Sequence, residues 1–225
     1  MSIQFYLTII LITVVLTIIT TIIISREILK NEFDQIKLDV TLDAMKESEE
    51  KIKKALMEHN LSVCSDIEMI AKALCIKKGG EDPSITKSQA HLSRADNNGI
   101  RTVTFRPGLG HTEKRFAFAH ECAHIVNKDE TPIDRPVGKN KPMCEQLADY
   151  VGAAMLMPYE EVNKALVKAN YSNLSKSARV RVIKSLCKQF DVSDIIALRR
   201  VNEVLILNKV YSENKYPNHN SSDQL

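Results

Sequence analysis

At 225 residues, the chain has room for one domain of ordinary size with an appendage, and it is long enough to bury a core without disulfide bonds. Its formal net charge is only +3, and both signs are scattered from residue 26 onward, which excludes proteins that bind nucleic acid through a strong overall positive charge. The five cysteines are an odd number, widely spaced and without a C-x-x-C pair, which excludes a disulfide framework and favours reduced thiols in a reducing compartment.

The first 25 residues contain no charged side chain, and the run FYLTIILITVVLTIITTIII, Phe5 to Ile24, is dominated by Ile, Leu, Val and Thr. A helix of this length, rising about 1.5 Å per residue, spans roughly 30 Å, which is the thickness of a bilayer core. The alternative, a secretory signal peptide, would need a basic start, a shorter apolar run and a small-residue cleavage site. Residues 1–25 are therefore predicted to form a transmembrane anchor.

Basic residues flank only the C-terminal side of this predicted span. Arg26, Lys30 and Lys37 follow it, whereas no Lys or Arg precedes it. By the positive-inside rule, the body of the chain is expected in the cytoplasm, which agrees with the unpaired cysteines. The prediction is a single-pass protein of a cell membrane, encoded by a bacterium or a phage, that meets the membrane through its N-terminal helix.

Residues 26–60 are highly charged, lack Gly and Pro, and carry apolar residues at helical spacing that the sequence KESEE interrupts. This pattern predicts a helical stalk that lifts the body off the membrane. A short coiled coil is the alternative, but the heptads do not persist.

Residues 65–108 are expected to contain a helix and then a β-hairpin. The segment SDIEMIAKALCI has Ser65 or Asp66 as its candidate N-cap, and KKGGEDP is expected to end the helix. The hairpin is predicted from SQAHLSRA and GIRTVTFRPG, in which polar and apolar residues roughly alternate around an Asp-Asn-Asn-Gly turn at 96–99. The strand from Ile100 to Phe105 is the best candidate to pair with an extended substrate by strand addition.

The stretch RFAFAHECAHIV has two histidines four residues apart, within a segment that predicts a helix from Thr112 to Val126. On a helix, His120 and His124 stand one above the other, so their imidazoles point to one position. Glu121 lies about 100° round the helix, where its carboxylate reaches a water on the metal rather than the metal itself. This H-E-x-x-H arrangement offers two zinc ligands and a general base, and the alternative is a metal-free core helix with costly buried polar groups.

A catalytic zinc needs a third protein ligand beside an open position for water. Glu145 is preferred because it begins a second predicted helix, MCEQLADYVGAAMLMP, whose Ala and Gly residues permit close approach to the first helix and which Pro158 ends. Asp149, one turn later, is expected to accept the outer N–H of a ligand histidine, with a solvated or capping carboxylate as the alternative. The other candidates for the third ligand are His111, Asp129, Glu130 and Asp134.

Residues 159 to about 207 predict three further helices, and QFDVSDIIALRRVNEV resembles the second half of a helix-turn-helix. Arg199 and Arg200 in this segment are candidate phosphate contacts, which is the basis of an alternative function as a DNA-binding regulator. Against this alternative, the recognition helix would be largely apolar, so no direct contact with nucleic acid is expected. Residues 211–225 are predicted to be a disordered tail.

The two motif-bearing stretches together resemble the ImmA/IrrE family of metallo-endopeptidases. The family pattern F-x-x-A-H-E-x-x-H is matched by Phe116, Ala119, His120, Glu121 and His124. The pattern E-x-x-A-[ND]-x-x-A/G-A-x-x-L-M-P is matched by Glu145, Ala148, Asp149, Gly152, Ala153, Leu156, Met157 and Pro158. The resemblance covers roughly residues 63–207 and is specific in these two motifs.

This resemblance implies a gluzincin-like peptidase with Zn²⁺ on His120, His124 and Glu145, and with Glu121 as the general base. Characterised members of the family cut helix-turn-helix repressors of mobile-element or stress-response genes, so a protein substrate of this kind is expected. The predicted transmembrane span is a departure from the soluble members.

The expected fold is α+β and mainly helical. Its expected parts are an anchor at 1–25, a helical stalk at 26–60, a zincin-like core with a small antiparallel sheet at 61–158, a helix-turn-helix-like subdomain at 159–210 and a tail at 211–225. The expected function is zinc-dependent hydrolysis of peptide bonds, and a zinc-binding anti-repressor that binds without cutting is a further alternative. The residue that steadies the oxyanion is left open among Tyr150, Tyr159, His91, His111 and Arg115.

Overall fold

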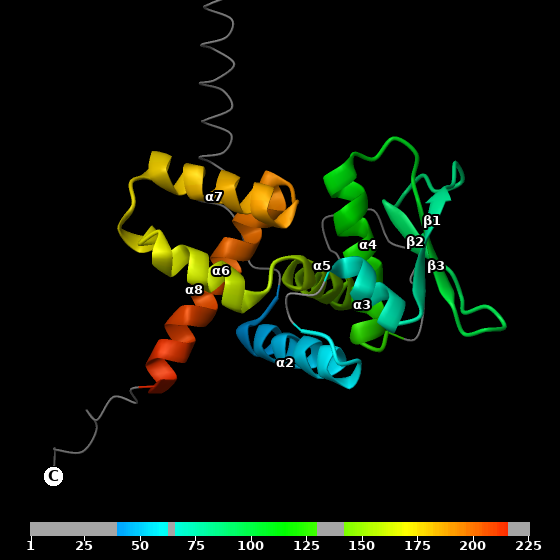
Figure 1. Cartoon of the computed structure of the whole chain (residues 1–225), viewed down its shortest axis with the longest axis horizontal. Helices are drawn as coiled ribbons and strands as arrows, with labels where there is room; N and C mark the ends of the chain where they lie inside the picture. The colour runs from blue at the N-terminus through cyan, green and yellow to red at the C-terminus, as the bar shows by residue number, and fades with distance from the viewer. Residues whose placement is uncertain (1–39, 63–65, 130–141, 216–225) are drawn as a thin grey trace, which may run out of the picture. The chain divides into compact units, whose positions relative to one another are not determined.

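The computed structural model describes residues 40–62, 66–129 and 142–215, which form α-helices and a small β-sheet (Figure 1). Its elements, in chain order, are α2 (Leu42–Glu58), α3 (Ile67–Ala73), β1 (Ile76–Glu81), β2 (Ala90–Leu92), β3 (Arg101–Phe105), α4 (His111–Val126), α5 (Met143–Leu156), α6 (Tyr159–Lys168), the 3-10 turn η1 (Tyr171–Asn173), α7 (Lys176–Phe190) and α8 (Asp194–Lys215). The predicted anchor at 1–25 lies outside the described residues. Within the described ranges, no helix combines the length and apolarity needed to cross a bilayer.

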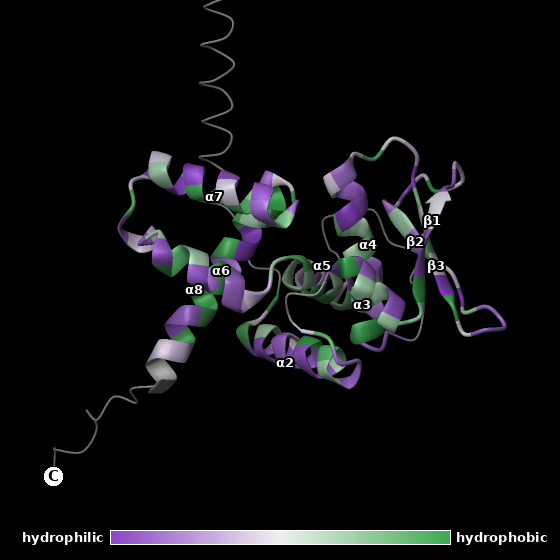
Figure 2. Ribbon diagram, viewed as in Figure 1, coloured by the Kyte–Doolittle hydropathy of each residue, from purple (hydrophilic) through white to green (hydrophobic). Residues whose placement is uncertain are grey.

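Helix α2 belongs to the globular body, which differs from the expected stalk. Thr41 caps it by accepting a hydrogen bond from the Ala44 backbone N, and its apolar face packs against α5. Figure 2 shows hydrophobic and hydrophilic residues alternating along α2, as a helix with one buried face requires. The KESEE sequence does not interrupt the helix, because Ser48 and Glu49 turn inward with Met45 and Ile52.

Helix α3 and strand β1 occupy the segment in which only a helix was predicted. Asp66 caps α3 by accepting from the Glu68 backbone N, and Cys75 then reverses the chain in the left-handed region, with φ of 56°. KKGGE does not merely end the helix but forms most of β1. Only Ile76 of this strand is fully buried, so the sequence carries no alternation by which a strand could be recognised.

The sheet is mixed rather than antiparallel, in the order β1-β3-β2. The predicted hairpin is confirmed, because β2 pairs antiparallel with β3, with Ala90 opposite Phe105. Its turn is held by the Asp96 carboxylate, which accepts from the backbone N of Asn98 and of Ile100. Strand β1 adds to the other side of β3 in parallel.

Strand β3 is therefore the central strand, with a neighbour on each side. The expectation that residues 100–105 pair with an extended substrate is wrong, because the backbone groups of a central strand are already used by its two neighbours. The two edges of the described sheet are β1 and β2.

Helix α4 lies beside the sheet, and α5 packs closely along α4 (Figure 1). Phe118 of α4 meets Phe105 of β3 with ring centroids 6.4 Å apart. Both helices have the bounds predicted from sequence to within a residue or two.

The predicted three helices after Pro158 are confirmed as α6, α7 and α8. Helix α8 is buried through much of its length, with Ala197, Val201 and Val204 at 0% exposure, and it contacts α5, α6 and α7. It continues to Lys215, so the expected disordered tail is wrong for residues 211–215, and residues 216–225 lie outside the described ranges.

Candidate metal centre

The close approach of α4 and α5 depends on one glycine. A Cβ atom at Gly152 would stand 3.0 Å from the His120 backbone N and 3.1 Å from its Cα, which is tighter than nearly all real Cβ contacts. Ala148 and Ala153 on the same helix are fully buried. Because small side chains let the helix backbones meet, the predicted tight packing of the two helices is confirmed, and it brings the first turn of α5 to the histidines of α4.

Three side chains from these helices converge on one point. His120 Nε2 lies 3.2 Å from His124 Nε2 and 3.3 Å from Glu145 Oε2, and His124 Nε2 lies 3.5 Å from Glu145 Oε1. Ligand atoms about 2.0–2.1 Å from a tetrahedral ion stand about 3.3–3.4 Å from one another. His120, His124 and Glu145 therefore form a group that can hold a metal ion with little rearrangement.

Burial makes this cluster costly without a cation. His120 and Glu145 are each 2% exposed, while His124 is part-exposed. A buried carboxylate between two imidazoles loses its hydration, and only a positive charge or hydrogen bonds replace it. Of the three side chains, that of His124 is the most exposed, at 14%.

A different carboxylate holds the outer ring nitrogen of each histidine. His120 Nδ1 lies 2.7 Å from Asp149 Oδ1, and His124 Nδ1 lies 2.8 Å from Asp129 Oδ2. A carboxylate at Nδ1 accepts a hydrogen bond from the Nδ1–H, so Nε2 is the unprotonated nitrogen and its lone pair faces the cluster. Asp149 thus lies within hydrogen-bond distance of the outer ring nitrogen of His120.

Asp129 was a candidate for the third ligand. Its carboxylate instead contacts the outer ring nitrogen of His124. Lys128 after α4 adopts the left-handed region with φ of 59°, and the Asp129 backbone N then donates to the His124 carbonyl O at 2.9 Å. This reversal turns the Asp129 carboxylate back onto His124. This arrangement could not be predicted from the sequence, because no pattern of residue types indicates that a lysine adopts a positive φ.

Other candidates for the third ligand are elsewhere. His111 begins α4, nine residues before His120 and so about 13 Å away along the helix axis, and its ring nitrogen bonds the Asp191 carboxylate. Glu130 and Asp134 lie outside the described residues.

Glu121 and Cys122 follow His120 on α4 and are both buried. Burial raises the pKa of the Cys122 thiol, with the Glu121 charge adding to the effect. A thiol with a raised pKa stays protonated and is a poor nucleophile and ligand. Cys75, Cys122, Cys144 and Cys187 are free thiols, and Cys64 is outside the described residues.

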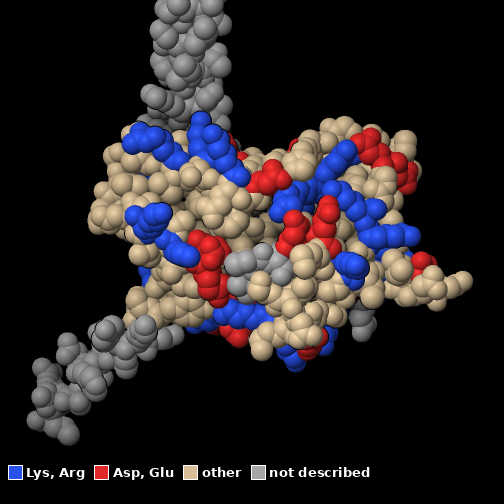
Figure 3. All heavy atoms as spheres, in the orientation of Figure 1, with Lys and Arg blue, Asp and Glu red and all other residues tan. Residues whose placement is uncertain are grey.

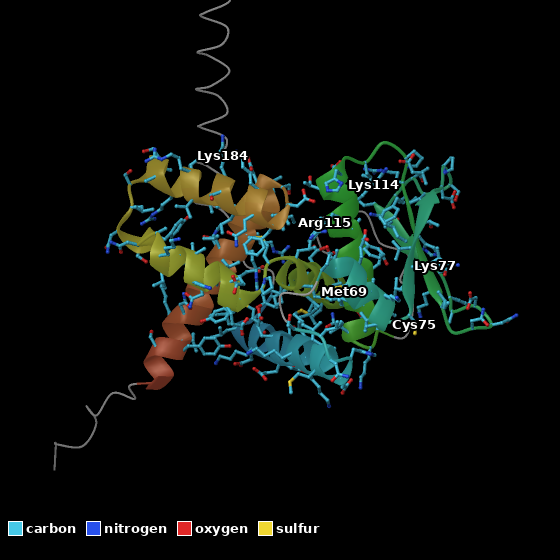
Figure 4. The ribbon with its side chains drawn as sticks, viewed as in Figure 1. Met69, Cys75, Lys77, Lys114, Arg115 and Lys184 are labelled. Atoms are coloured by element: carbon cyan, nitrogen blue, oxygen red, sulfur yellow. The ribbon has the colours of Figure 1, made fainter. Side chains whose placement is uncertain are left out.

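The tyrosines and the arginine named as oxyanion candidates have other partners. The Tyr150 hydroxyl donates to Glu49 at 2.7 Å in the core, where burial raises its pKa, and the Tyr159 hydroxyl donates to Asn208. Arg115 lies on the first turns of α4 beside Lys114 (Figure 4) and lines a cleft of about 480 Å³ together with Asp66 and Asp191. None of these contacts directs the three side chains to the cluster.

The arginines proposed as phosphate contacts point into the protein. Arg200 is fully buried and donates to Glu49 and to the Met157 carbonyl O, and Arg199 is 18% exposed and donates to Glu203. Figure 3 shows Lys and Arg interspersed with Asp and Glu on the visible face. The DNA-binding alternative therefore loses the two contacts on which it was built.

Residues 82–202 match the peptidase M78 family, described as the IrrE N-terminal-like domain. This range is more than half of the chain and contains α4, α5 and the first turns of α8. The chain belongs to this family. The M78 domain is metallopeptidase-like, and it holds the His, His and Glu cluster within the matched range. No curated protein matches the chain at a significant level.

Proposed function

We propose that this M78 protein is a zinc-dependent endopeptidase. The observation that carries the proposal is the convergence of His120 Nε2, His124 Nε2 and a Glu145 carboxylate oxygen, 3.2–3.5 Å apart. Two imidazoles and one carboxylate are a donor set that suits zinc, and three protein ligands leave a fourth position for water or substrate.

Each residue has a distinct part in this proposal. Zinc, when bound, would supply a Lewis acid for the peptide carbonyl and lower the pKa of water toward 7. Glu121 accepts the proton of the attacking water and returns it to the leaving amine. Asp149 and Asp129 hold the two imidazoles in the tautomer that presents Nε2 to the cluster.

We also propose a substrate and a location. The substrate is a helix-turn-helix repressor of a mobile element or a stress response, supported by the family resemblance. The chain is held at the cytoplasmic face of a cell membrane, supported by the uncharged first 25 residues and the basic residues that follow them.

Cleavage of a repressor tests the function directly. The purified full chain, loaded with zinc, is mixed with candidate helix-turn-helix repressors from the same genome, and fragments are sought by mass spectrometry with and without a chelator. We expect a defined new fragment that the chelator abolishes and added zinc restores.

The variant Glu121→Gln is expected to bind zinc as the native chain does and to cut the same repressor about 10²–10⁴-fold more slowly. Glu58→Gln, at an exposed position ending α2, is the matched control and should cut at the native rate. If Glu121→Gln cuts as fast as the native chain, Glu121 is not the base. Stable capture of the uncut repressor by the zinc-loaded native chain would instead favour the anti-repressor alternative.

A further inference from the structure

The carboxylate that holds His120 is itself held by an arginine from the C-terminal helix. Asp149 Oδ1 faces His120 Nδ1, and Asp149 Oδ2 lies 3.7 Å from Arg199 Nη1 on α8. Both side chains are largely buried, with 12% of Asp149 and 18% of Arg199 exposed. The two oxygens of one carboxylate therefore have two different partners.

Arg199 is fixed in place by a buried carboxylate one turn further along α8. Its Nε donates to Glu203 Oε1 at 2.9 Å, and Glu203 is 1% exposed. The second oxygen, Glu203 Oε2, lies 3.5 Å from Arg200 Nη1, and Arg200 is anchored by the Met157 carbonyl O and by Glu49. The guanidinium of Arg199 thus lies between the carboxylates of Asp149 and Glu203, and Glu203 is buried in the core.

A cation beside Asp149 offsets the repulsion between the Asp149 and Glu145 carboxylates. Glu145 and Asp149 are one turn apart on α5, where two like charges repel. Both are buried, so water screens that repulsion poorly. A guanidinium on the side of Asp149 away from His120 offsets it without competing for Oδ1.

We infer that Arg199 is a positioning residue for the metal centre: it holds the Asp149 carboxylate so that Oδ1 accepts the Nδ1–H of His120 and so directs His120 Nε2 at the metal. The inference rests on the metal site of the proposed function. It also assigns to the helix-turn-helix-like segment a structural part in that site.

Zinc affinity measures this role without reference to cleavage. The native full chain and its variants are titrated with zinc against a chromophoric chelator, and the absorption spectrum of the Co²⁺-loaded forms reports the ligand geometry. Arg199→Met keeps most of the side-chain length and removes the charge, and we expect the zinc Kd to rise about 10–100-fold with a changed Co²⁺ spectrum.

Two further variants calibrate the result. Arg199→Lys restores the charge but not the fork that reaches both carboxylates, so its Kd should fall between those of the native chain and Arg199→Met. Arg181→Met makes the same substitution at an exposed arginine of α7 and should leave the Kd unchanged.

A double-mutant cycle separates positioning from a general loosening of α8. In an Asp149→Asn background, Arg199→Met should change the zinc Kd less than about twofold, because the partner through which Arg199 acts has already been altered. If Arg199→Met does not fold, the same cycle is run with Arg199→Lys, whose partial loss of affinity should vanish in the same background.

The inference is overturned if Arg199→Met binds zinc as tightly as Arg181→Met does, or if its loss of affinity is equally large in the Asp149→Asn background. These outcomes are independent of proteolysis. A native chain that binds zinc tightly, shows the expected cycle and cuts no repressor would uphold the role of Arg199 and contradict the peptidase proposal.

Discussion

At the scale of single residues, the two histidines of the cluster depend on carboxylates with different origins. Asp149 stands on α5, on a rigid helix, whereas Asp129 stands on the turn that follows α4. His120 is 2% exposed and His124 is 14% exposed at its side chain. The histidine nearer to solvent, His124, is therefore oriented by a residue outside any helix.

Asp129→Asn is expected to raise the zinc Kd about 10–100-fold, because the amide keeps the shape of the side chain but loses the charge that strengthens the hydrogen bond from His124 Nδ1. Chelator competition measures the change. Asp43→Asn, at an exposed position of α2, is the control and should bind zinc as the native chain does. An unchanged Kd for Asp129→Asn would mean that the His124 ring is held by other contacts.

The contrast between the two aspartates shows what sequence can predict about this site. Residues four apart on a helix share a face, so the spacing alone placed His120 beside His124 and Asp149 one turn from Glu145. The contact of Asp129 depends on a positive φ at Lys128, which a lysine adopts only when the surrounding structure requires it. Such a conformation is decided by tertiary packing and leaves no pattern in the chain.

At the scale of elements, the candidate metal centre forms because α4 and α5 approach to backbone contact. Gly152 sits against the His120 backbone, two turns after Glu145 on the same helix. The separation of the helices at Gly152 therefore sets the distance from Glu145 to both histidines. Neither helix carries the whole ligand set.

Gly152→Ala is expected to lower the free energy of unfolding by about 1–3 kcal/mol, because the added Cβ meets backbone atoms that cannot rotate away. Denaturant unfolding measures the loss, and zinc titration should show weaker binding as Glu145 moves outward. Gly80→Ala is the matched control, since a Cβ there meets nothing within 4 Å. Equal stability of the two variants would show that α5 shifts at no cost.

The elements that sequence reasoning placed wrongly have a common physical cause. Strand β1 is a polar edge strand, and α2 has a glutamate on its buried face, so neither carries the hydrophobic pattern of its true position. The hairpin and helices α6 and α7 were predictable because their buried residues follow the strand or helix period. Glu49 is buried because it pairs with Arg200, which is far away in the chain, and from sequence alone such a glutamate is predicted to be exposed to solvent.

At the scale of the whole molecule, a buried ionic network joins helices that are far apart in the chain. Glu49 of α2 accepts from Arg200 of α8 and from Tyr150 of α5, both at 2.7 Å. Arg200 is 0% exposed and its guanidinium lies 5.3 Å from the Tyr150 ring centroid. The first and last described helices therefore share one core, although about 150 residues separate the two charges.

Glu49→Ala is expected to destabilise the protein by about 3–5 kcal/mol, because Arg200 is left as a buried charge without its closest carboxylate. Thermal or denaturant unfolding measures the effect. Glu50→Ala, at the exposed neighbour that pairs with Lys53 at the surface, should cost less than about 1 kcal/mol. Similar losses for the two variants would mean that the network does not depend on α2.

The burial of α2 also limits how far the proposed catalytic body can stand from a membrane. A stalk over residues 26–60 would have used α2 as part of the connection, but α2 packs against α5 in the folded body and so adds nothing to the reach of a tether. In the proposed membrane-held chain, a repressor must therefore come close to the lipid surface to meet the site, so the tether itself selects substrates by position.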